Sequence, residues 1–247
     1  MSVWQGVLEW FADPAHWQGA DGVPNRVFQH VSYSLIASLL AIAIALPIGL
    51  VLGHTGKGGQ LAINVSNLGR AIPSFGIIIL AFIVAGIGFL PVLVTLVALA
   101  IPPIITNTYV GMRAVDPEVR EAAEGMGMTG WQLLRGVEMP IAQPLIMAGI
   151  RTSVVQVIAT ATLAAFISLG GLGRYIIDGF GQRNTPEVIS GAILVAALAL
   201  LTEYGLAAVQ RATLSKGLAR SSRVAEAAVG AKMGAPPPDM FQPPALP

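Results

Sequence analysis

The sequence of 247 residues contains no cysteine, and this absence excludes several kinds of site at once. Without thiols there can be no disulfide framework, no thiolate nucleophile and no cysteine-based metal centre. Histidine is almost as scarce, and His16, His30 and His54 do not follow the spacing of metal ligands. The P-loop pattern GxxxxGK[ST] is also missing, so the chain is not expected to hydrolyse ATP itself. We therefore expect neither a metal nor a cofactor bound to this chain.

Charged residues are few, at 11% of the chain, whereas a soluble domain typically carries about a quarter. Hydrophobic residues make up 54% of the chain, and the mean hydropathy is +0.71. Several uncharged stretches exceed the roughly 20 residues that a helix needs to cross a bilayer. These features predict an all-α, polytopic integral membrane protein. A net charge of +1 without a basic stripe gives no reason to expect nucleic-acid binding.

The uncharged blocks predict five membrane-spanning helices, at about residues 31–53, 62–86, 91–112, 141–169 and 187–210. The block 71–112 carries no charge and is too long for one span, so we expect a hairpin at residues 86–91. The fourth predicted helix would exceed the roughly 30 Å hydrocarbon core, so its first turns should protrude from the membrane.

Residues 27–212 are predicted to form one transmembrane domain, with a shorter segment on each side. Three of the four tryptophans lie in residues 1–26, which indicates a segment at the headgroup level. No signal peptide precedes the first apolar block, which should act as an uncleaved first span. Residues 213–247 are basic and then proline-rich, so this tail is expected to be disordered.

Lysine and arginine are distributed unevenly between the two sides of this five-span arrangement, which predicts its orientation. With the tail inside, the inner set is Lys57, Arg70, Arg113, Arg120, Arg135, Arg151, Arg211, Lys216, Arg220, Arg223 and Lys232. The outer set is Arg26, Arg174 and Arg183. The excess of positive charge inside places the N-terminus outside, and both the C-terminus and residues 116–140 in the cytoplasm.

Residues 116–140 are the most polar stretch of the chain and are predicted to form two short helices. Asp116 suits the N-cap of the first helix, and Pro117 suits its first position. Gly125 and Gly127 can supply the positive φ that ends a helix and turns the chain.

The second helix of this stretch is expected to begin with a capping box. Thr129 and Gln132 have the three-residue spacing in which each side chain can bond the other's backbone amide. Gly136 is expected to close this helix, and Pro140 to start a new one.

The same stretch carries the pattern EAA, three residues, glycine, nine residues, an aliphatic, any residue, an aliphatic and proline. The residues that meet it are Glu121, Ala122, Ala123, Gly127, Val137, Met139 and Pro140. This pattern resembles the EAA loop of ABC-importer permeases and implies the type I importer permease fold. Over residues 29–210, EAAEGMGMTGWQLLRGVEMPIAQPLIMAGIRT and SLGGLG resemble the permeases of osmoprotectant importers for glycine betaine, carnitine, choline and proline.

The resemblance implies a permease subunit in the bacterial cytoplasmic membrane. In that family the loop docks into a cleft on a separate cytoplasmic ATPase, which binds the ATP. Further implied partners are an extracytoplasmic solute-binding protein and a second permease, identical or homologous. Glu121 would orient the ATPase contact, Ala122 and Ala123 would keep its surface flat, and Gly127 would set the bend.

Polar residues within the apolar blocks form two further sets of candidates. Prolines interrupt the second and third spans, and irregular backbone at membrane depth is expected only where protein or a water-filled cavity covers it. Candidates for the wall of a solute pathway are Ser74, Thr106, Asn107, Gln156 and Thr160. Ordinary helix packing explains the prolines equally well. Glu203, an acid within an apolar block, is expected to form a structural ion pair with Arg151.

Two alternatives remain open at this point. One is a permease of the same fold for an amino acid such as methionine. Aromatic residues make up only 6% of the chain, so solute selectivity is expected to reside in the binding protein. The other is a stand-alone channel or a membrane-embedded enzyme. An enzyme would need clustered nucleophiles, metal ligands or paired carboxylates, so we do not expect the chain to be one.

Overall fold

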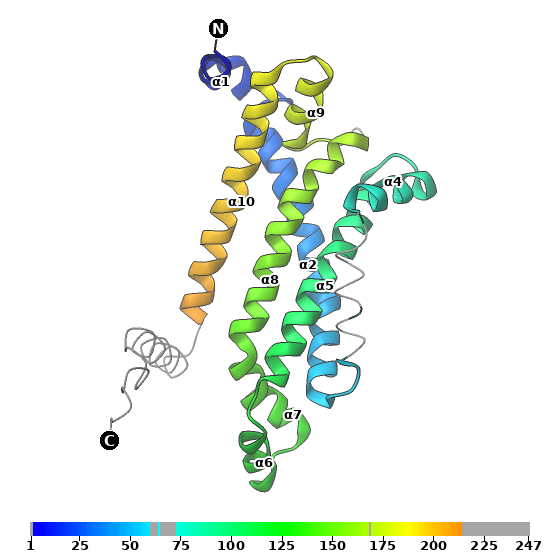
Figure 1. The fold of residues 1–247 in the computed structure, drawn as a ribbon, viewed down its shortest axis with the longest axis vertical. Helices are drawn as coiled ribbons and strands as arrows, with labels where there is room; N and C mark the ends of the chain where they lie inside the picture. Colours follow the sequence, from blue (N-terminus) through cyan, green and yellow to red (C-terminus); the bar gives the residue numbers. More distant parts are fainter. Residues whose placement is uncertain (1, 60–63, 65–72, 168, 214–247) are drawn as a thin grey trace, which may run out of the picture. The chain divides into compact units, whose positions relative to one another are not determined.

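The computed structural model describes residues 2–59, 64, 73–167 and 169–213, and residues 1–211 belong to one compact unit. All regular secondary structure within the described ranges is helical, in agreement with the predicted all-α class. The elements are α1 (Val3–Ala12), η1 (Pro14–Trp17), α2 (Val23–Thr55), α4 (Ser74–Ala85), α5 (Phe89–Arg113), α6 (Pro117–Gly125), α7 (Gly130–Leu133), η2 (Leu134–Glu138), α8 (Met139–Ala161), η3 (Thr162–Ile167), α9 (Gly173–Gly181) and α10 (Thr185–Thr213) (Figure 1). The segments η1 and η3 are 3-10 helices, and η2 is one π-helical turn.

Four helices in the described residues are long and apolar enough to cross a membrane: α2, α5, the continuous helix Gly130–Ile167 and α10. The predicted limits of the spans at 91–112 and 187–210 agree with α5 and α10 within three residues at each end. The predicted span 62–86 is described only at residue 64 and from residue 73 onward. There α4 has 12 residues, which at 1.5 Å per residue is about 18 Å and shorter than a bilayer core. The count of five spans therefore remains a prediction.

Two helix limits differ from the sequence-based ones. The first spanning helix begins at Val23, ahead of the predicted start at residue 31. Pro24 at its second position favours the first helical turn, and the residues from there to His30 continue the helix. The fourth predicted span, 141–169, lies almost entirely within the continuous helix Gly130–Ile167, which is long and apolar enough to cross a membrane. Its α-helix ends at Ala161, and the Thr162 hydroxyl bonds the carbonyl of Ala159 at 2.8 Å as the chain tightens into η3.

Glycines allow α2, α5 and α8 to pack closely. A Cβ atom added at Gly49 of α2 would lie 2.7 Å from Cβ of Thr108 on α5. One added at Gly149 of α8 would lie 2.6 Å from Cβ of Asn107 on α5. Because no larger residue fits these contacts without displacing a neighbour, the glycines set the spacing of the three helices.

The end of the unit that carries the N-terminus is closed by α1, η1 and α9 (Figure 1). Trp10 stacks on His16 with ring centroids 4.3 Å apart and meets the edge of Tyr175 at 5.1 Å. The Tyr175 hydroxyl donates to the carbonyl of Asp21 at 2.6 Å, and burial raises the pKa of Tyr175 to about 12. These contacts attach the N-terminal segment to α9.

A buried histidine joins α2 to the start of α9. The amide of Leu172 donates to Nδ1 of His30 at 3.3 Å, so Nε2 carries the proton and donates to the carbonyl of Ile158 at 2.9 Å. Gly171, within the SLGGLG stretch, has φ +91 and lies against this ring. His30 thus has a structural role, with both ring nitrogens satisfied by backbone groups.

Candidate functional site

The loop at residues 116–140 lies at the opposite end of the unit from α1 and α9 (Figure 1). Asp116 caps α6 as predicted, accepting a hydrogen bond from the Glu118 amide at 2.9 Å. Gly127 has φ +83, which confirms its predicted role in the turn. The prediction for Gly125 was wrong: it is the last residue of α6 and does not have a positive φ. One left-handed residue is enough to end the helix, because the Met128 amide then reaches the carbonyl of Ala123 at 3.2 Å.

The second helix begins with the predicted capping box. The Thr129 amide donates to Oε1 of Gln132 at 2.7 Å, and the Gln132 amide donates to the Thr129 hydroxyl at 3.4 Å. The predicted break at Gly136 was wrong, because α7, η2 and α8 form one continuous helix. The Met139 amide bonds the carbonyl five residues back, at Leu134. This π-helical turn accommodates Pro140, which lacks an amide hydrogen and whose ring would otherwise meet the carbonyl of Gly136.

The motif residues divide into exposed and buried ones. Glu121 and Ala122 are exposed on α6, whereas Ala123 is 2% exposed and holds α6 against the rest of the loop. Ala123 therefore does not contribute to a flat outer surface in this chain. Val137 and Met139 are half-buried, and Pro140 is exposed.

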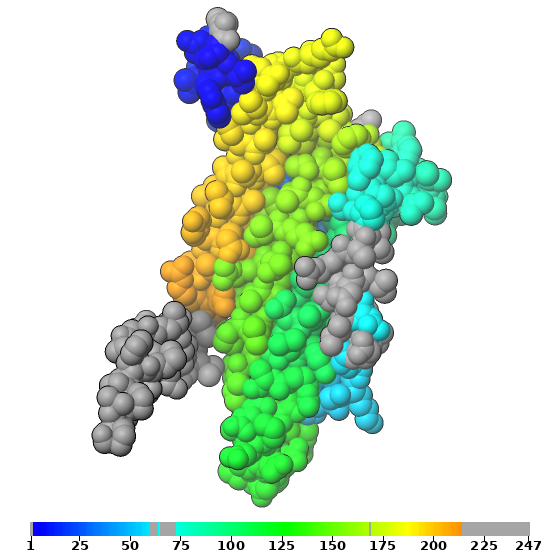
Figure 2. All heavy atoms as spheres, viewed as in Figure 1, coloured from blue at the N-terminus to red at the C-terminus, as the bar shows by residue number. Residues whose placement is uncertain are grey.

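The loop also exposes apolar side chains although it is polar overall. Val119, Met126 and Trp131 are 41%, 76% and 61% exposed. The guanidinium of Arg135 lies 4.4 Å from the centroid of the Trp131 ring. Exposed apolar side chains rimmed by charged ones are typical of a surface that contacts another protein. Figure 2 shows that this loop forms the lowest part of the surface, below α8 and α5.

A buried ion cluster attaches the loop to the spanning helices. Glu138 of η2 is fully buried, and its Oε2 accepts from Nδ1 of His54, at the end of α2, at 2.6 Å. Nη2 of Arg120 on α6 lies 3.0 Å from Oε1 of Glu138 and donates to the carbonyl of Met112 on α5 at 2.7 Å. Sequence reasoning missed this cluster, because Glu138 occupies the motif position that accepts any residue.

The structure brings Arg151 and Glu203 together in an ion pair between α8 and α10. Nη1 of Arg151 also donates to Oε1 of Gln210 at 2.6 Å, and Nε2 of Gln210 donates to the carbonyl of Pro144 at 3.2 Å. This polar network joins the two helices in the half nearer the loop. The thermodynamic coupling of the pair remains a prediction.

The proposed pathway residues lie on three elements. Ser74 begins α4, Thr106 and Asn107 lie on α5, and Gln156 and Thr160 lie on α8, all half-buried. Nδ2 of Asn107 donates to the carbonyl of Pro103 in its own helix at 2.8 Å, and its Cβ lies against Gly149 of α8. A pathway formed by these residues remains a prediction.

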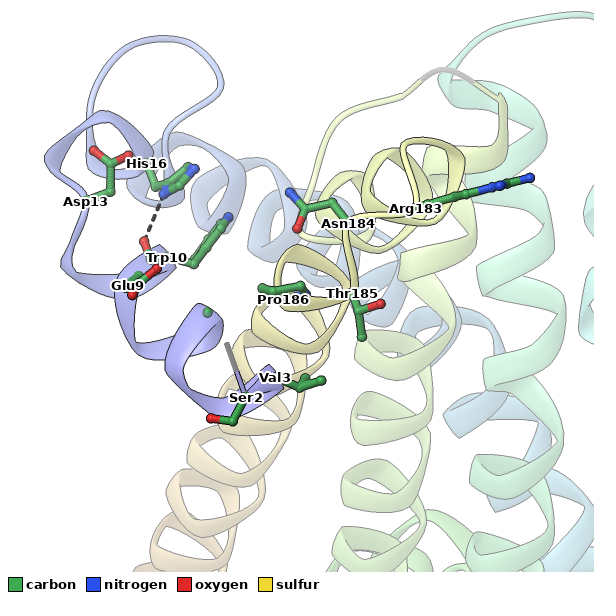
Figure 3. Close-up of a pocket in the computed structure, with 11 residues that line it drawn as sticks. Ser2, Val3, Glu9, Trp10, Asp13, His16, Arg183, Asn184, Thr185 and Pro186 are labelled. Carbon is green, nitrogen blue, oxygen red and sulfur yellow. Dashed lines mark hydrogen bonds between the residues drawn. The ribbon is translucent and has the colours of Figure 1, made fainter.

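Several pockets lie outside the loop, and two of them are formed between spanning or N-terminal helices. At the N-terminal end, a pocket of about 540 Å³ separates α1 from the start of α10, and Figure 3 shows Glu9 and Asp13 on one side and Thr185 and Pro186 on the other. An apolar pocket of about 280 Å³ lies among α2, α8 and α10. Among the described residues, no three acidic or histidine side chains gather as in a metal site.

Residues 45–214 match the family described as "Binding-protein-dependent transport system inner membrane component". The chain is 41% identical over 190 residues to the glycine betaine/carnitine/choline transport system permease protein OpuCB of Bacillus subtilis (strain 168), covering 77% of this chain and 88% of that one. It is 43% identical over 183 residues to the carnitine transport permease protein OpuCB of Listeria monocytogenes, covering 73% and 83%. It is 36% identical over 199 residues to the osmoprotectant import permease protein OsmW of Salmonella typhimurium (strain LT2), covering 78% and 93%.

Among solved structures, the fold is similar to a chain of the MetNI methionine ABC transporter in an inward-facing conformation. The TM-score is 0.67 at 21% identity, over 77% of this chain and 95% of that one. At this level of identity the similarity shows the fold alone.

Proposed function

Since the chain belongs to the family of binding-protein-dependent transport system inner membrane components, we propose that it is a permease subunit of an ATP-driven importer for osmoprotectants such as glycine betaine, carnitine and choline. The observation that carries this proposal is its identity of 36–43% to permeases named for these solutes, over most of both chains. The folded EAA loop supports the same role, because a permease without a P-loop needs a surface that a separate ATPase can contact.

The ATPase would dock on the loop at residues 116–140. Glu121 is exposed on α6, and the apolar side chains of Met126 and Trp131 are exposed close to it in the chain. A docking ATPase would bury these apolar groups, and it would supply the bound ATP that this chain has no motif to bind. In this arrangement the permease performs no chemistry of its own.

The orientation proposed for the chain places the loop in the cytoplasm and the N-terminus outside a bacterial cytoplasmic membrane. The positive residues at the loop end include Lys57, Arg113, Arg120 and Arg135. Those at the N-terminal end are Arg26, Arg174 and Arg183. Together with the remaining positive residues of the inner set, this distribution follows the positive-inside rule.

A solute-binding protein would dock at the N-terminal end, where α1, η1 and α9 form the surface. A second permease, identical or homologous, would pack beside the spanning helices and complete a solute pathway along a common axis. Extensive apolar surface remains exposed on α2 and α10, which leaves room for both lipid and a second permease.

The test is uptake by the reconstituted complex. The chain, its ATPase and its binding protein in liposomes should accumulate labelled glycine betaine, carnitine or choline only when ATP and the binding protein are both present. Labelled methionine serves as the matched alternative solute. Uptake of methionine without uptake of any quaternary ammonium solute would contradict the solute class, and uptake without ATP would contradict the importer.

A further inference from the structure

Among the carboxylates that the structure describes, Glu138 alone is fully buried. It lies in η2, at the point where the cytoplasmic loop becomes the spanning helix α8. An isolated buried carboxylate is costly, so its contacts matter for the whole region. Those contacts come from two other elements, His54 at the end of α2 and Arg120 on α6.

Arg120 extends the connection to a fourth element. The same Nη2 that lies 3.0 Å from Glu138 donates to the carbonyl of Met112 on α5 at 2.7 Å. One carboxylate and one guanidinium thus connect α6 with α2, α5 and the helix that continues into α8. Gly130, the first residue of α7, lies beside the His54 ring, where an added Cβ would be 3.4 Å from Nε2.

The other attachments of α6 are less directional. Its buried side chain is that of Ala123, a single methyl group, and its covalent link to α5 is the short turn at residues 114–116. Apolar contacts are non-directional and permit sliding, whereas charge-assisted contacts are short and fix geometry. The cluster therefore adds charged contacts with α2 and with the helix that continues into α8 to the covalent link between α6 and α5.

We propose that Glu138 is a positioning residue of the transport cycle, through which movement of α6 is passed to α2, α5 and α8. This inference rests on the proposed function, because the movement would come from the ATPase docked on the loop. Stability alone gives little reason for the cluster, since apolar packing of similar volume is often as stable as a buried ion pair. What the cluster adds is a fixed connection between four helices.

The first test measures how many ATP molecules are hydrolysed for each glycine betaine taken up by the reconstituted complex. Glu138→Gln keeps the shape and removes the charge, and it should raise this ratio about tenfold, within the usual range of coupling between distant sites. Glu138→Asp keeps the charge and should return the ratio toward that of the wild type. Glu203→Gln breaks an ion pair between two helices outside the loop and should leave the ratio unchanged.

A loss of folded complex alone would lower uptake and hydrolysis in proportion and would leave the ratio as in the wild type. That result for Glu138→Gln, or an equal rise for Glu203→Gln, would overturn the proposal. The ratio therefore distinguishes a coupling role from a purely structural one.

The second test does not depend on transport. The chain lacks cysteine, so spin labels can be placed at Val51→Cys on α2 and Val119→Cys on α6, both exposed positions. The distance distribution between these labels in the purified chain should be narrow, should broaden with Glu138→Gln or Arg120→Gln, and should not change with Glu203→Gln. An unchanged distribution in both cluster variants would refute the connection. If the wild type takes up no osmoprotectant, the proposed function fails, and the label distances still decide whether Glu138 holds α6 to α2.

Discussion

The replacement of Gly149 by alanine tests whether glycines set the spacing of α5 and α8. The added Cβ would lie 2.6 Å from Cβ of Asn107 and 3.0 Å from the carbonyl oxygen of Pro103. The second of these atoms is backbone and cannot rotate away, so the helices must separate. Overpacking of this kind typically costs about 1–3 kcal/mol of unfolding free energy.

A matched control is Gly205→Ala on α10, where an added Cβ has no neighbour within 4 Å. Both substitutions gain the same helix propensity, about 1 kcal/mol, so this gain cancels in the comparison. The difference between the two variants should therefore be close to the packing cost alone, with Gly149→Ala the less stable.

Thermal unfolding of the purified chain in detergent measures this difference. By the scaling for soluble proteins of this size, each kcal/mol corresponds to about 2–4 °C in Tm. Gly205→Ala should match or exceed the wild-type Tm, and Gly149→Ala should unfold several degrees below Gly205→Ala. Equal Tm values for the two variants would show that α5 and α8 do not depend on this close approach.

Three further predictions concern topology, coupling and the second ion pair. A single cysteine at Ala15 should react with a membrane-impermeant reagent from outside and one at Gly58 should not, while the opposite pattern would reverse the orientation. Gly127→Pro should abolish uptake and leave the solute affinity of the separate binding protein unchanged. The reason is that proline fixes φ near −65°, whereas the turn at Gly127 has φ +83. Normal uptake by this variant would mean that the motif match is accidental. A double-mutant cycle on Arg151 and Glu203 should show about 1 kcal/mol of coupling in unfolding free energy, and strictly additive losses would exclude a stabilising pair.

The features that could be predicted from the sequence depend on residues close together in the chain. The N-cap at Asp116 and the capping box of Thr129 with Gln132 involve partners within three positions, so their chemistry is visible in the sequence. The limits of α5 and α10 follow from where the charges are, because a charged side chain rarely lies within the hydrocarbon core. Gly127 was identified by the spacing of a motif and by the backbone freedom of glycine.

The features that were missed depend on packing between distant segments. Gly136 normally favours a helix end, but Leu133 and Leu134 are buried on the adjoining turn and hold the helix together through the π-helical turn. Glu138 looked like an ordinary loop acid, because its partner His54 lies 84 positions away. A charge in the freely variable position of the motif was the available signal, but the sequence does not identify its partners.

The packing divides the described spanning helices into a tight group and a loosely attached helix. Half of the apolar stretch of α5 is buried against its neighbours, whereas only 11% of the corresponding stretch of α10 is buried. Dispersion forces therefore hold α2, α5 and α8 together, while the position of α10 depends more on the polar contacts of Arg151 and on the α9 contacts at the other end. Because the Glu138 cluster is attached to the tight group, a force applied to α6 would move α2, α5 and α8 as one body. Among the described residues, the polar contacts that would pass the same force to α10 are the Arg151 network and those at the N-terminal end. A break at Glu203 and a break at Glu138 should therefore have different consequences.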